Sequence, residues 1–166
     1  MDFSGLDYAG KVELFKKILE SKIHGISYSP YMDDQEPGME IDETQIEQRL
    51  KIIQPYTHWI RTFSCVEGNQ HTPAIARRYG LKTMVGVCLS DNKDKNEIEL
   101  ANGIEIARNG DAGILAIGNE VLLRGELTEQ ELIEYINRAK QALPGVSVSY
   151  VDAYFQFEDH PALTAA

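Results

Sequence analysis

The sequence predicts an α/β protein, because short apolar runs alternate along the chain with amphipathic stretches of helical periodicity. The apolar runs lack a strict in–out alternation, which is typical of parallel strands buried on both faces. Five runs, near Ile23, Trp59, Thr83, Ile114 and Val146, follow one another at steps of 36, 24, 31 and 32 residues. A (β/α)8 barrel of roughly 250 residues repeats about every 31 residues. Residues 1–166 are therefore predicted to form a single domain, a partial (β/α)8 TIM barrel of about five parallel strands with flanking helices.

The predicted strands are short apolar runs bounded by turn-forming or polar residues. They cover residues 23–29, 59–64, 82–89, 113–118 and 146–151. Pro30 stops the first run, and the Pro144–Gly145 pair turns the chain into the last one. Residues 31–40 form a polar loop after the first strand.

The predicted helices are amphipathic segments with recognisable start and stop signals. They cover residues 7–21, 42–54, 72–79, 92–109 and 128–142, and a further helix starts at 159–166. Asp7 is suited to cap the first helix, and Thr128 with Glu131 forms a capping box at the fifth. Pro73 opens the third helix and Gly110 closes the fourth.

Two other kinds of α/β protein share this alternation of strands and helices. An open, doubly wound sheet would carry a glycine-rich phosphate turn, but no strand here is followed by G-x-G-x-x-G. A phosphate-binding barrel isomerase would bind phosphate in loops after its seventh and eighth strands, and five strands do not reach them.

The composition excludes several classes of partner. The net charge is -10 and the pI is near 4.8, whereas nucleic acids and anionic membrane surfaces attract clusters of Lys and Arg. No run approaches the roughly 18 apolar residues of a membrane span. The N-terminal segment from Met1 to Asp7 is acidic and has no apolar signal region, so the chain as given is expected to be cytoplasmic. No organic cofactor is implied.

In a barrel of this kind, chemistry takes place at the carboxyl ends of the strands. The residues expected there include carboxylates, aromatic rings and one arginine. They are Ser27, Tyr28 and Tyr31 after the first strand, Arg61, Phe63 and Glu67 after the second, Cys88, Ser90 and Asp91 after the third, Asn119 and Glu120 after the fourth, and Tyr150 and Asp152 after the fifth. Carboxylates can act as general acid or nucleophile, and aromatic faces can stack on sugar rings.

Four passages in this order resemble glycoside hydrolase family 17, the family of the β-1,3-glucanases, and they look closest to its bacterial members. They are Gly25-Ile26-Ser27-Tyr28, Ile60-Arg61-Thr62-Phe63, Lys82-Thr83-Met84-Val85-Gly86-Val87 and Ile117-Gly118-Asn119-Glu120-Val121. The last resembles the family's acid/base motif, in which an Asn directly precedes the catalytic Glu. The likeness runs from about Ile23 to Val151.

The resemblance implies a retaining β-1,3-glucan hydrolase or transglycosylase. Glu120 would be the general acid/base, raised in pKa by apolar neighbours such as Ile117, and Asn119 would bind the sugar 2-hydroxyl. Tyr28 and Phe63 would contact the substrate, a β-glucan or its oligosaccharides. Arg61 would support the nucleophile. The bland alternatives are that Glu67, Asp91 and Asp152 are loop charges and that Tyr28 and Phe63 are core aromatics.

The nucleophile is the missing part of this prediction. The family places it on a seventh strand, and this sequence offers five. The chain is therefore expected to be an incomplete barrel without measurable glucanase activity of its own. A homodimer that completes the open sheet is a predicted partner arrangement, because unpaired strand edges invite pairing. The alternative function is a non-catalytic carbohydrate-binding half-barrel, or a decayed paralogue.

The remaining reactive residues predict structure rather than chemistry. Cys65 and Cys88 are expected to be free buried thiols. The four histidines, His24, His58, His71 and His160, have no metal-ligand spacing, so no metal site is predicted.

Overall fold

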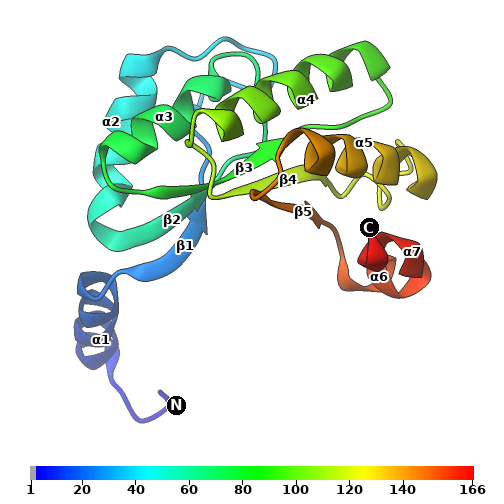
Figure 1. Cartoon of the computed structure of the whole chain (residues 1–166). Helices are drawn as coiled ribbons and strands as arrows, with labels where there is room; N and C mark the ends of the chain where they lie inside the picture. The colour runs from blue at the N-terminus through cyan, green and yellow to red at the C-terminus, as the bar shows by residue number, and fades with distance from the viewer. Residues whose placement is uncertain (1–2) are drawn as a thin grey trace.

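The computed structural model describes residues 3–166 and contains one five-stranded parallel sheet in the order β1-β2-β3-β4-β5 (Figure 1). Its strands are β1 Ile23–Ser27, β2 Thr57–Arg61, β3 Lys82–Val87, β4 Ile114–Asn119 and β5 Ser147–Val151. Each strand pairs with the next one in the sequence. A barrel is built in this way, whereas a doubly wound sheet reverses its strand order at a switch point. The predicted partial barrel is confirmed and the doubly wound alternative is wrong.

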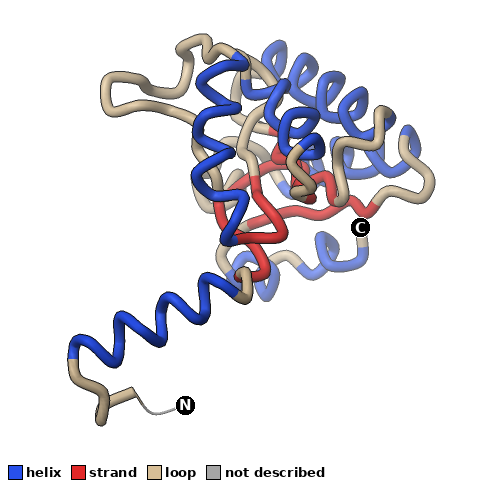
Figure 2. Tube along the Cα trace, turned by 90° about the vertical axis from the view of Figure 1, so that its left-hand side faces the viewer, coloured by secondary structure: helices blue, strands red, loops and turns tan. Residues whose placement is uncertain are grey.

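The main helices cover one face of the sheet. They are α2 Glu43–Ile53, α3 Thr72–Arg78, α4 Lys93–Arg108 and α5 Glu129–Ala142, with short 3-10 turns η1 Gln54–Tyr56 and η2 Asn69–His71. Figure 1 shows α2 to α5 on the same side of the strands, which leaves the other face to form the inside of a barrel. Helix α1, Tyr8–Glu20, projects away from this body and buries none of its residues (Figure 2).

Most predicted boundaries lie within two residues of those in the structure, and the second strand and the C-terminal region differ more. β1 ends at Ser27 rather than at residue 29. β2 runs from Thr57 to Arg61 rather than over 59–64, because β1 pairs with the polar residues at its start. The helix predicted at 159–166 corresponds to α7 Pro161–Ala165, and the short helix α6 Tyr154–Asp159 before it was not predicted. Pro161 cannot continue α6, since its ring removes a backbone donor and restricts the residue before it.

Two hydrophobic clusters fill the space between sheet and helices. One joins β1 and β2 to α2 and α3 through residues such as Ile46, Leu50 and Ile60. The other joins β3, β4 and β5 to α4 and α5, with Leu115 and Leu132 fully buried.

Within residues 3–166 no helix is long and apolar enough to cross a membrane. The N-terminal segment in which no signal region is predicted includes residues 1 and 2, and these two lie outside the described residues.

The capping box of α5 provides a local test of the fold. The Glu131 amide donates to Thr128 Oγ1 at 3.3 Å, and the Thr128 amide donates to Glu131 Oε2 at 2.8 Å. Thr128→Ala is expected to cost about 1 kcal/mol. For a domain of this size, such a loss lowers the melting temperature by about 2–4 °C. Circular dichroism at 222 nm measures the change. Thr44→Ala, at an exposed position inside α2, is the control and should not lower it; equal losses would contradict the cap.

Candidate active site

Three predicted site residues meet at the carboxyl ends of β2 and β4. Arg61 is the last residue of β2, and Asn119 is the last residue of β4. The Arg61 Nη2 donates to Asn119 Oδ1, a contact that crosses the intervening strand β3. Glu120 follows directly, and its charge acts on Arg61. The sequence prediction that these residues converge is consistent with this geometry, while their chemical roles stay predictions.

Arg61 is held in a half-buried position. Its guanidinium lies 4.7 Å from the centre of the Phe63 ring, which is a favourable cation–π distance. Burial lowers the pKa of Arg61, and the nearby Glu120 charge opposes that shift. The Arg61 Nε is buried and has no hydrogen-bond partner within residues 3–166. A buried donor without an acceptor is unfavourable, so this atom is ready to bind an anionic or carbonyl oxygen.

Glu120 stands on an irregular piece of backbone. Its φ of 53° lies in the left-handed region that residues other than glycine rarely adopt, and Gly118 nearby has a φ of 88°. The β4–β5 register shifts between Ala116 and Asn119, and the Glu120 amide donates to the Val151 carbonyl at 2.8 Å. Strained backbone of this kind gathers at functional sites.

The expected burial of Glu120 is not what the structure shows. Its side chain is exposed, and the apolar Ala116 and Ile117 before it are buried in the sheet rather than folded over the carboxylate. Strand residues alternate between faces, so their position behind Glu120 in sequence does not make them its cover. Within the described chain, nothing yet desolvates this group as an acid catalyst requires.

The two predicted aromatic contacts take different positions. Tyr28 is 5% exposed, and its hydroxyl donates to the Ile46 carbonyl at 3.2 Å within the core against α2. Because Ser27 lines the open face of the sheet, Tyr28 faces the helix layer. Burial raises the pKa of its hydroxyl. Phe63, by contrast, is 40% exposed beneath Arg61, so it retains an accessible ring face.

Arg124 belongs to the same site and was not singled out from the sequence. Its Nη1 donates to the Asn119 carbonyl at 2.6 Å, and its Nη2 pairs with Glu126 at 2.6 Å. The same Nη2 reaches the Leu89 carbonyl after β3 at 3.4 Å. Arg124 therefore ties the loop after β3 to the segment that carries Glu120. A single arginine in a turn gives no periodic signal by which a sequence reading could find it.

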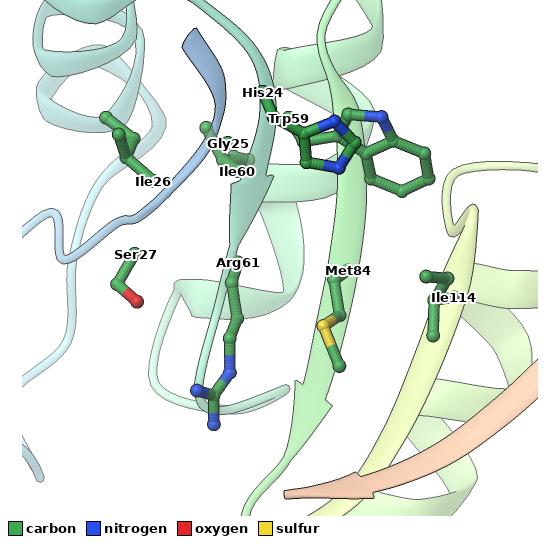
Figure 3. Close-up of a pocket in the computed structure, with 9 residues that line it drawn as sticks. All are labelled: His24, Gly25, Ile26, Ser27, Trp59, Ile60, Arg61, Met84 and Ile114. Carbon is green, nitrogen blue, oxygen red and sulfur yellow. The ribbon is translucent and has the colours of Figure 1, made fainter. Parts of the chain in front are cut away.

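A pocket of about 290 Å³ opens on the inner face of the sheet (Figure 3). The residues around it are His24, Gly25, Ile26, Ser27, Trp59, Ile60, Arg61, Met84 and Ile114. Figure 3 shows Arg61 and Met84 side by side on neighbouring strands. The lining includes Arg61 but neither Asn119 nor Glu120, so the pocket lies on the sheet's open face beside these two predicted site residues rather than around them.

The cysteines only partly match expectation. Both are free thiols, and Cys65 is buried, but Cys88 is exposed. Burial raises the pKa of the Cys65 thiol, which donates to the Gly86 carbonyl. Cys88 comes one residue after β3 ends, where the chain emerges at the rim of the sheet. Among residues 3–166 no three His, Cys, Asp or Glu side chains gather as a metal site would require.

Comparison with known proteins gives matches in sequence and in structure. The sequence model of the BtgE/BtgC glycoside hydrolase domain matches residues 25–166. Two solved structures are similar. One is a glycoside hydrolase family 17 β-1,3-glucanosyltransferase from Rhizomucor miehei, with 25% sequence identity and a TM-score of 0.69. The other is an active-site mutant of the Rhizomucor miehei β-1,3-glucanosyltransferase in complex with laminaritriose, with 26% sequence identity and a TM-score of 0.68. Each match covers 83% of this chain and 52% of the other, so the chain spans about half of their length. No curated protein matches significantly.

Proposed function

The chain belongs to the BtgE/BtgC glycoside hydrolase domain family, and we propose that it carries the acid/base part of a retaining β-1,3-glucan hydrolase or transglycosylase. Glu120 is the general acid/base in this proposal. The similarity to a β-1,3-glucanosyltransferase, and the laminaritriose bound by an active-site mutant of that kind of enzyme, support a β-1,3-linked glucan as the substrate class.

The observation that carries the proposal is the Arg61–Asn119 hydrogen bond beside Glu120. Since Arg61 occupies Asn119 Oδ1, the amide nitrogen of Asn119 is left to donate. It has no partner of its own within residues 3–166, so a sugar hydroxyl is the acceptor that it suits. A hydrogen bond to the 2-hydroxyl strengthens in the transition state of glycoside hydrolysis.

The proposed reaction follows from two carboxyl groups. In the first step Glu120, protonated, gives its proton to the glycosidic oxygen as the bond to the anomeric carbon breaks, while a second carboxylate bonds that carbon. In the second step Glu120, now a carboxylate, takes a proton from water or from a sugar hydroxyl, which displaces the enzyme carboxylate. Retention of configuration requires the two groups to be about 5 to 5.5 Å apart.

The nucleophile is proposed to lie on a strand outside the five described here, consistent with a match to 52% of the related structures. The unpartnered Arg61 Nε supports this arrangement, because a carboxylate near it would satisfy a buried donor. Strands that complete the barrel would also cover Glu120 and supply the desolvation that an acid catalyst needs. Residues 1–166 alone are therefore expected to bind a glucan without cleaving it.

Laminaritriose titrated into ¹⁵N-labelled chain tests this function by amide shift changes. Shifts centred on Arg61, Asn119 and Glu120 are expected, with no cleavage products, and the β-1,4-linked cellotriose should cause weaker ones. Asn119→Ala should weaken laminaritriose binding roughly tenfold, since a sugar hydrogen bond is lost. Glu120→Gln should bind like the parent, as should the exposed Glu134→Gln control.

The outcomes separate the alternatives. No shifts in the parent chain, or shifts confined to other surfaces, would contradict the proposed site. Cleavage that disappears in Glu120→Gln would support Glu120 while placing a working nucleophile within residues 1–166, against the arrangement proposed above.

A further inference from the structure

Residues at the end of β5 form hydrogen bonds with the turn that carries Glu120. The Leu122 amide donates to the Tyr150 hydroxyl at 3.1 Å, and the Leu123 amide reaches Asp152 Oδ2 at 3.4 Å. The Tyr150 hydroxyl itself donates to Asp152 Oδ2. With the bond from the Glu120 amide to the Val151 carbonyl, three consecutive residues of the chain around the end of β5 hold the segment that begins at Glu120.

Tyr150 and Asp152 are each held in place by further contacts. Tyr150 is 8% exposed, and its ring lies 5.9 Å from the Phe157 ring, centre to centre. It also packs under Gly118, where an added Cβ would come within 3.2 Å of the tyrosine ring. Asp152 Oδ1 accepts the Ala153 amide at 2.7 Å, which orients the carboxylate. The Tyr150 hydroxyl and the Asp152 carboxylate are therefore already oriented toward the turn.

The turn needs such support because its first residue is strained. A left-handed φ at a residue with a side chain is disfavoured by about 1 kcal/mol or more, and it persists only where several contacts impose it. Within the turn, the Arg124 amide donates to the Glu120 carbonyl at 2.9 Å, which closes the backbone but does not fix its position over the sheet. The contacts from Tyr150 and Asp152 supply that position.

We propose that Tyr150 and Asp152 are positioning residues, a clamp that holds the backbone of Glu120 in the conformation from which its carboxyl group faces the substrate. The role of the clamp in catalysis rests on the proposed function, whereas its action on the backbone does not. Neither residue touches the glucan in this proposal. The clamp acts through the amides of Leu122 and Leu123.

Tyr150→Phe is the variant that tests the clamp, because it removes the hydroxyl and retains the packed ring. We expect the Leu122 amide to exchange with solvent about tenfold faster, as for the loss of one buried hydrogen bond. The backbone of Glu120, followed by its three-bond HN–Hα coupling, should leave the left-handed region. Interior amides of β4, such as Leu115, should keep their exchange rates relative to global stability.

Tyr79→Phe is the matched control. The Tyr79 hydroxyl donates to Glu47 Oε1, another tyrosine–carboxylate hydrogen bond, but it lies before β3 and thus at the opposite end of the sheet. A similar loss of stability without any change at Glu120 or Leu122 is expected. Unchanged Leu122 exchange and Glu120 coupling in Tyr150→Phe would overturn the clamp.

A second variant and a separate binding measurement complete the test. If Tyr150→Phe does not fold, Asp152→Asn takes its place. The amides of Leu123 and Ala153 should then exchange faster, because one of the two carboxylate oxygens that accept them becomes an amide donor. Unchanged exchange at both amides would overturn the clamp. Laminaritriose titration of the parent chain judges the proposed function separately. Absence of binding there contradicts that function, and the exchange comparison still decides whether the clamp exists.

Discussion

Gly86→Ala is expected to destabilise the protein by about 3 kcal/mol, at the upper end of the range for overpacking. A Cβ on Gly86 would lie 2.3 Å from the Thr62 carbonyl oxygen and 2.9 Å from Phe63 Cα, both backbone atoms. Those atoms cannot move freely, because the Thr62 amide is bonded to the Met84 carbonyl at 3.0 Å and the Gly86 amide faces Thr62 Oγ1 at 3.2 Å. Relief requires the ends of β2 and β3 to separate.

The matched control is Gly80→Ala. Gly80 has a φ of 73° and no atom within 4 Å of an added Cβ, so alanine there is strained but not obstructed. It should cost about 1 kcal/mol. Urea unfolding measures both, with the change in midpoint converted to free energy through a common slope. A smaller loss for Gly86→Ala than for Gly80→Ala would show that the strand ends yield easily.

The same substitution bears on the site. The chain from Thr62 to Phe63 leads directly from Arg61, so its displacement should move the guanidinium away from Asn119. Amide shifts at Asn119 and a loss of laminaritriose binding are expected in Gly86→Ala and not in Gly80→Ala. This result would show that the close approach of β2 and β3 holds the Arg61–Asn119 contact in place.

The strand–helix alternation could be predicted from sequence because short apolar runs indicate buried strands and apolar residues at helical spacing indicate amphipathic helices. Boundaries that depend on pairing could not. The predicted second strand starts at Trp59, yet β1 also pairs with Thr57, so β2 begins two residues earlier. The start of α7 could be predicted more closely, since Pro161 is suited to the first turn of a helix.

The convergence of Arg61, Asn119 and Glu120 could be predicted because all three lie at strand ends. The direction in which a side chain points could not be predicted in the same way. Tyr28 is one residue from the open face and therefore points into the helix layer. The exposure of Glu120 depends on what covers the open face, which strand-end position alone does not specify.

Glu99 is a buried carboxyl group at the ends of β2 and β3 whose burial could be predicted from the sequence. In α4 the buried positions 96, 99, 100, 103, 106 and 107 follow helical spacing, which places polar Asn96 and Glu99 on the buried side. Glu99 is fully buried and joins the ends of two strands. Ser64 Oγ donates to its Oε1 at 2.5 Å, and the amides of Cys65 and Cys88 donate to its Oε2 at 2.7 and 3.1 Å.

The pKa of Glu99 predicts how stability depends on pH. Burial raises the pKa of this carboxyl above its ordinary value, and the hydrogen bonds from Ser64, Cys65 and Cys88 oppose the shift only in part. The folded protein thus binds the proton more tightly than the unfolded chain does. The resulting stabilisation is complete below the unfolded pKa of about 4.3 and is lost as pH rises through the folded pKa.

Glu99→Gln should therefore gain stability relative to the parent as pH rises through that window. The gain is about 1.4 kcal/mol for each unit by which the pKa is raised. Glutamine preserves the shape, since its carbonyl can accept both amides while its NH2 faces Ser64 Oγ. Urea unfolding between pH 4 and pH 8 measures the difference, and the exposed Glu105→Gln on the same helix is the control that should show no such trend.

Glu99→Leu separates the cost of the charge from the value of the acceptor. Leucine fills similar space but leaves the Ser64 hydroxyl and the Cys65 and Cys88 amides without their acceptor, so a loss of at least about 3 kcal/mol is expected at every pH. A flat or falling Glu99→Gln difference would mean that the three hydrogen bonds outweigh burial. The carboxylate would then hold the ends of β2 and β3 together most strongly when charged, and acid rather than base would loosen the site.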